Sequence, residues 1–262
     1  MFPISRQVIG ASCAFCLCML GVGGLQCPRL QSMLKAQDNI TTETLQRELD
    51  LEKLRLQILN KLPSFGFSNL VANLVYINFL NYFGDDAARN KTDYSLSPEY
   101  FTIIIDRDPK FIQAYLGLST STSMYAAMPE RAVELIEKGL KSLKPQAPKY
   151  SYYIWRYKGI DELLFLGNSQ AAKTSFANAS DWASSYADKK SKNVAYFSRT
   201  TSEFLSRKPD SKKAQIGAWV MILNHQVDQK GKERAIKGIE ALGGRVIPQP
   251  DSTHSIQLPP ED

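Results

Sequence analysis

The chain has 262 residues, of which 44% are hydrophobic and 22% are charged, so it can form one large domain or two small ones and is not a disordered chain. All four cysteines lie within the first 27 residues, and there are only two histidines. A thiolate metal site beyond position 27 and most histidine-dependent catalysis are therefore excluded. The formal net charge is +6, and residues 188–245 carry 13 basic against 6 acidic side chains. This stretch is either a solvated helical surface or a patch for anionic lipid or an acidic partner.

The N-terminal segment has the pattern of a membrane signal. Residues 8–25 carry no charge and follow Arg6, as in an export signal or a single membrane anchor. Cys27 leaves lipidation as an alternative, although Gln26 before it departs from the usual pattern. We therefore expect residues 1–30 to be a signal peptide or membrane anchor, and the body to be exported to a periplasm or a thylakoid lumen.

The remainder of the chain shows helical periodicity and no sustained strand-like alternation. Apolar residues recur every three or four positions, and prolines, glycines and polar caps separate the segments. The fold class expected is all-α. The predicted helices cover residues 43–62, 68–83, 98–106, 111–125, 129–143, 152–166, 170–187, 194–206, 212–227 and 231–242. The segment 68–83 is apolar on most faces, which predicts a central helix.

Two helix pairs share a spacing typical of tetratricopeptide (TPR) units. Large and small residues alternate where paired helices would approach closely, and the two pairs superimpose with a period of 40 residues. Each pair holds one more residue between its helices than the usual unit. The residues predicted to pack this repeat are Tyr115, Ala132, Ile136, Gly139, Trp155, Gly159, Gly167, Ala172, Phe176 and Ala179. We expect a TPR-like α-solenoid over residues 41–245, followed by a disordered tail over residues 246–262 that is rich in proline.

Several segments resemble a group of membrane-anchored TPR-like proteins of bacteria, especially cyanobacteria. The resemblance covers roughly residues 50–185, and the segments that carry it are LPSFGF at 62–67, NFLNYFGD at 78–85, DRDPKF at 106–111 and WRYKG at 155–159. It implies a helical body fixed to a membrane and used as an adaptor. It supplies no catalytic residues.

The densest aromatic run offers a candidate partner-binding surface. Tyr153, Arg156 and Tyr157 would share one helix face, with Lys158 beside them, and an arginine between aromatic rings is a good anchor for a partner segment. The alternative is that the tyrosines pack between helices and Arg156 pairs with a carboxylate.

No catalytic, metal-binding or cofactor-binding constellation stands out. The acidic groups at 85–86 and 106–108 fit helix caps and turns, and His225 has no catalytic partner nearby in the sequence. The run of serine and threonine at 119–123 either lets two helices pack closely or lines a groove. We expect a non-catalytic, membrane-tethered scaffold or assembly factor whose TPR-like concave surface binds a membrane-associated protein or peptide, and we expect no nucleic-acid binding. The alternatives are an enzyme accessory of the envelope and a protein that binds anionic lipid through its basic C-terminal helices.

Overall fold

The computed structural model describes residues 15, 18–24, 26–27, 41–224, 229–248 and 254–260. It is mostly helical, as the sequence predicts. The chain divides into two compact units, Met1–Asp50 and Leu51–Asp262. Helix α2 (Thr42–Lys61) begins in the first unit and ends in the second. The predicted anchor over residues 1–30 and His225 fall largely or wholly outside the described residues.

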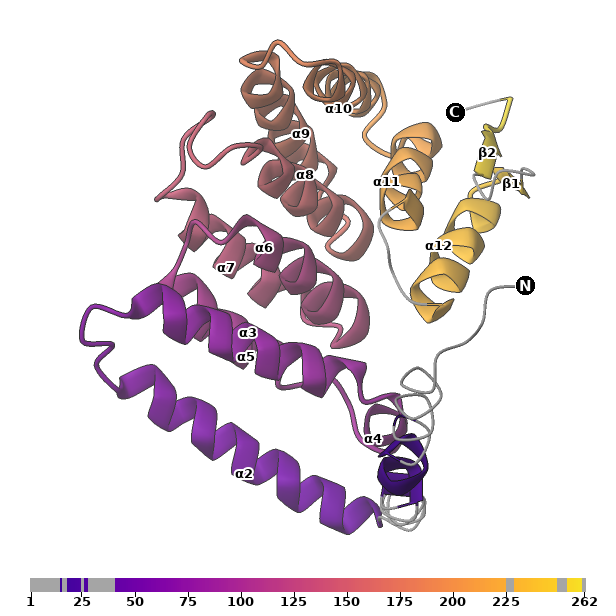
Figure 1. Cartoon of the computed structure of the whole chain (residues 1–262). Coiled ribbons are helices and arrows are strands. Elements are labelled where there is room, and N and C mark those ends of the chain that lie inside the picture. The colour runs from indigo at the N-terminus through magenta and orange to yellow at the C-terminus, as the bar shows by residue number, and fades with distance from the viewer. Residues whose placement is uncertain are drawn as a thin grey trace, which may run out of the picture. The chain divides into compact units, whose positions relative to one another are not determined.

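The second unit contains helices that contact their neighbours in chain order (Figure 1). The π-helical segments η1 and η2 continue α6 and α8 directly. The elements that follow α2 are α3 (Ser68–Gly84), α4 (Asp86–Lys91), α5 (Ser97–Arg107), α6 (Ile112–Leu118), η1 (Ser119–Tyr125), α7 (Pro129–Leu140), α8 (Tyr152–Ile160), η2 (Asp161–Phe165), α9 (Ser169–Ser184), α10 (Lys189–Arg207), α11 (Lys212–Asn224) and α12 (Gln229–Ala241).

Helix α3 is not the central helix that its composition predicts. One face is buried and includes Phe79, whose ring meets that of Phe101 at 4.5 Å. The opposite face is left open, with four aliphatic side chains that are 49–55% exposed: Leu70, Leu74, Ile77 and Leu80. The α2–α3 turn adds Phe65, which is 83% exposed, and Phe67, which is 66% exposed. Helix α3 is therefore apolar on two faces, and the rest of the described structure covers only one of them.

The hairpins α6–η1/α7 and α8–η2/α9 repeat the same backbone bonds 40 residues apart. The amide of Ala126 donates to the carbonyl of Ser121, and the amide of Leu166 donates to the carbonyl of Asp161, five residues earlier in each case. A bond of this length encloses one residue more than an α-helical bond. The extra residue predicted from the spacing of each pair is therefore accommodated in a π-helical turn.

The residues predicted to pack the repeat lie largely where these helices touch. Trp155 is half-buried, and its ring meets that of Trp182 edge-on at 5.8 Å. A Cβ added at Gly139 would lie 2.7 Å from Cζ of Tyr115, and one at Gly159 would lie 3.1 Å from the ring of Phe176. Six of the predicted residues have no exposed surface, namely Tyr115, Ala132, Ile136, Ala172, Phe176 and Ala179. Gly167 occupies the turn before α9 with a φ of +64°.

The last described residues form two short strands where the sequence predicts a disordered tail. Strand β1 (Arg245–Pro248) pairs antiparallel with β2 (His254–Gln257), and Val246 lies opposite Ile256. Both of these side chains pack against an apolar cluster of α11 and α12 that includes Ile216 and Ile239. The burial of these side chains stabilises the two strands, which the proline-rich composition did not indicate.

None of the described helices is both long and apolar enough to cross a lipid bilayer.

Candidate binding site

A pocket of about 640 Å³ lies between α8, α10, α11 and the C-terminal hairpin. Most of its lining comes from two helices whose side chains recur at helical spacing, so each helix presents one continuous stripe to it. The lining residues are Tyr153 and Arg156 of α8; Tyr196, Phe197, Thr200, Thr201 and Phe204 of α10; Lys213, Ile216, Gly217, Val220, Met221 and Asn224 of α11; and Ile256 and Leu258 at the C-terminal end.

Helix α10 presents one stripe to the core and another to this pocket. Ser198 and Leu205 belong to the buried stripe, whereas Tyr196 is 66% exposed and Phe197 is 57% exposed. The rings of Tyr196 and Phe197 contact each other edge-on at 5.4 Å. Large aromatic side chains that stay exposed beside a pocket extend the apolar surface available to a bound molecule.

Arg156 brings a buried positive charge to the pocket. The residue is only 9% exposed, and its Nε has no hydrogen-bond partner among the described residues. Its guanidinium lies 5.9 Å from the ring centroid of Tyr153. None of the ion pairs within the described part of the chain involves Arg156. Because burial disfavours the charged form, the pKa of this guanidinium is lowered.

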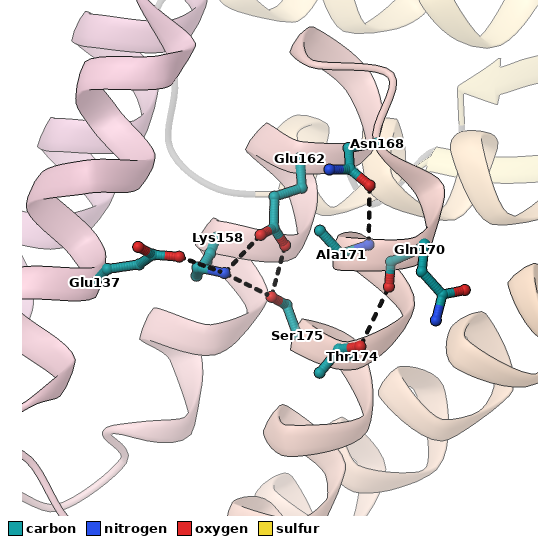
Figure 2. Close-up of polar contacts among 8 residues, drawn as sticks. All are labelled: Glu137, Lys158, Glu162, Asn168, Gln170, Ala171, Thr174 and Ser175. Carbon is teal, nitrogen blue, oxygen red and sulfur yellow. Dashed lines mark hydrogen bonds and ion pairs between the residues drawn. The ribbon is translucent and has the colours of Figure 1, made fainter.

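Lys158 lies only two residues away and, unlike Arg156, has acidic partners (Figure 2). Its Nζ lies 2.5 Å from Oε1 of Glu162 and 3.2 Å from Oε1 of Glu137. The hydroxyl of Ser175 donates to the other oxygen of Glu162 at 2.6 Å. This internal network satisfies the ammonium of Lys158, so Lys158 holds α8 against α7 and α9 and does not line the pocket.

The four predicted partner-binding residues therefore separate into two groups. Tyr153 and Arg156 line the pocket. Tyr157 is 8% exposed and its ring stacks on that of Tyr153 at 6.2 Å, and burial raises the pKa of its hydroxyl. Tyr157 and Lys158 thus support the helix that carries the site. Of the alternative interpretation, the packing of a tyrosine between helices agrees with the burial of Tyr157, whereas none of the ion pairs among the described residues gives Arg156 a carboxylate partner.

Asp161 is a buried carboxyl group that no sequence pattern singles out. It begins η2, has no exposed surface, and its Oδ1 accepts a hydrogen bond of 2.8 Å from Oγ of Ser119 in η1. Burial raises the pKa of Asp161 to about 7, while the bond from Ser119 acts in the opposite direction. The carboxyl lies in the packing between the two π-helical segments and is not among the residues that line the pocket.

The serine- and threonine-rich run lies in this same packing. Ser119, Ser121, Thr122 and Ser123 are all buried in η1. Of the two interpretations of this run, close helix packing is the one that the burial supports. The small side chains leave room for η1 and η2 to approach.

Three of the four acidic residues at 85–86 and 106–108 have structural partners. Asp85 accepts from the amide of Ala88 and caps α4, and Asp108 accepts from the amide of Lys110. Asp106 forms an ion pair with Lys138 instead of with its neighbour Arg107. Across the described residues, no group of three or more His, Cys, Asp or Glu side chains could hold a metal ion.

The pocket residues of α10 and α11 were missed at the sequence level. The available signal was the aromatic pair Tyr196 and Phe197, which lies outside the buried stripe of its own helix. Phe204 and Val220 line the same pocket only because α10 packs against α11, which the sequence does not reveal.

Comparisons with protein-family models, with curated proteins and with solved structures find no match to this chain. The likeness to membrane-anchored TPR-like proteins therefore stays a prediction from the sequence.

Proposed function

We propose that this chain is a TPR-like helical scaffold that binds a segment of a partner protein in the pocket between α8, α10 and α11. The pocket itself carries the proposal. It joins an apolar lining from two helices with exposed aromatic side chains at its rim, and interface cores are enriched in aromatic residues. Its volume suits several side chains of a bound segment.

The assignment to a TPR-like architecture is supported by the two hairpins with equivalent bonds 40 residues apart. In each hairpin a glycine lets a large ring approach, with Tyr115 against Gly139 in the first and Phe176 against Gly159 in the second. Stacked hairpins of this kind bury their apolar faces against neighbours and leave one surface available for ligands.

We also propose that the N-terminal segment holds the scaffold at a membrane. The uncharged run over residues 8–25 supports this, and so does the open apolar face of α3 with its neighbouring turn. Phe65 and Phe67 at that turn are the kind of side chains that enter a lipid interface.

The pocket can be narrowed at Gly217, where an added Cβ meets no close contact. A Cβ at this position would have only Oγ1 of Thr201 within 4 Å, at 3.9 Å, so Gly217→Leu directs its side chain into the pocket. Replacing a glycine inside a helix also favours that helix by about 1 kcal/mol. Gly84→Leu is the matched control, because this exposed glycine of α3 has no atom within 4 Å of an added Cβ.

The test is affinity purification of the full chain and of both variants from solubilised membranes, with cross-linking to locate the contact. We expect a partner that is recovered with the wild type and Gly84→Leu, is lost with Gly217→Leu, and cross-links to α10 or α11. Equal recovery with Gly217→Leu would show that the pocket is not where the partner binds.

A further inference from the structure

Arg156 gives the pocket a chemical preference that a purely apolar groove would lack. We propose that the bound partner segment presents a carboxylate to Arg156 and seats neighbouring apolar side chains against Phe197, Phe204 and Val220. This inference rests on the proposed function and adds the chemistry by which the partner is selected.

The absence of an internal anion is the first reason. Lys158, on the same helix, is matched by two glutamates, whereas no carboxylate in the described residues pairs with Arg156. A buried charge without a partner is costly, and a ligand that supplies the counter-charge removes that cost. The buried Nε of Arg156, which has no hydrogen-bond partner among the described residues, is direct evidence that no internal group balances this charge.

A carboxylate matches the geometry and charge of this site. A guanidinium presents paired N–H groups that bind both oxygens of a carboxylate at once. The single buried guanidinium balances the one negative charge that a carboxylate supplies. The surrounding stretch from residue 188 to residue 245 has a net charge of +7, from 13 basic and 6 acidic residues, which favours the approach of an acidic segment.

The rim favours a polypeptide over a small amphipathic acid. The rings of Tyr196 and Phe197 line the pocket and also stay largely exposed, so they extend its apolar surface out to the rim. A longer segment can contact both the buried guanidinium and these outer rings. Buried arginine and aromatic anchors of this kind dominate the binding energy of protein interfaces.

The test uses random dodecamer peptides displayed on phage and selected on the full-length protein. Enriched peptides are synthesised in pairs, with each Asp or Glu kept or replaced by Asn or Gln, and their affinities are measured by fluorescence anisotropy. We expect wild type to prefer the acidic member of each pair by about tenfold or more. We expect the preference to vanish in Arg156→Met, which keeps the length of the side chain and removes its charge.

Each result has a defined meaning. Apolar peptides that bind the wild type with no preference for the acidic member, or a preference that persists in Arg156→Met, would overturn the carboxylate inference and leave the pocket function standing. Peptides that bind Gly217→Leu as tightly as wild type would overturn both. Dodecanoate that binds more tightly than every selected peptide would overturn the assignment to a protein segment. The peptide-side comparison on wild type needs no variant, so it decides the matter even if Arg156→Met does not fold.

Discussion

Asp161 makes the stability of this protein depend on pH near neutrality. Its pKa is raised from 3.8 to about 7, principally because the carboxyl is buried. Between these two values the unfolded chain has released a proton that the folded chain still holds. Deprotonation therefore favours the unfolded state as the pH rises, and stability is greatest at the acidic end of this window. A shift of about three units corresponds to about 4 kcal/mol in total, or about 1.4 kcal/mol per pH unit.

The Asp161→Asn variant removes this titration and keeps an oxygen that can accept from Ser119. We expect the free energy of unfolding of the wild type to fall by about 1.4 kcal/mol per pH unit within the window, and that of Asp161→Asn to lack this decline. Asp188→Asn is the control. Its carboxylate is exposed and its pKa is lowered by the backbone amide of Ser191, so the proton has already left below the window.

The measurement is urea denaturation followed by circular dichroism at several pH values, on wild type and both variants. Comparison with Asp161→Asn cancels the contributions of all other titratable groups, because the wild type and the variant share them. A wild-type slope that persists unchanged in Asp161→Asn would refute the reasoning.

Four further substitutions test packing, backbone conformation and lipid contact. Gly139→Ala should lower the free energy of unfolding by about 1–3 kcal/mol in urea titrations, because the fully buried Tyr115 has no room to move aside. Ala127 has a φ of +54° and Gly167 one of +64° at equivalent turns, and a positive φ favours glycine over alanine. Ala127→Gly should therefore raise the melting temperature, and Gly167→Ala should lower it. Shifts of the same sign would contradict this. Phe65→Ser should weaken flotation of residues 41–262 with liposomes by about tenfold, and unchanged flotation would argue against lipid contact at this turn.

Local sequence determined where the helices form and where they end. Helical periodicity and the terminating Gly84 predicted a helix over 68–83, which is observed as Ser68–Gly84. Periodicity with Pro98 at the start and Pro109 beyond the end predicted one over 98–106, which is observed as Ser97–Arg107. The extra residue in each hairpin was also visible in the spacing. These features depend on residues within a few turns of one another, so the sequence carries them directly.

Tertiary structure decided which side chains of α8 are available to a partner. Tyr153, Arg156, Tyr157 and Lys158 are close in sequence, and nothing local distinguishes their roles. Lys158 is neutralised by Glu137 of α7 as well as by its own helix, while Arg156 faces α10 and α11 and meets no acid among the described residues.

The difference between local sequence and tertiary packing also explains the two corrected expectations, the disordered C-terminal tail and the central position of α3. The C-terminal strands exist because Val246 and Ile256 find an apolar surface on α11 and α12, and the open face of α3 exists because its neighbours cover only one side. A sequence pattern states how apolar a face is. Whether that face is buried depends on helices far along the chain, because burial is a property of packing and not of the segment alone.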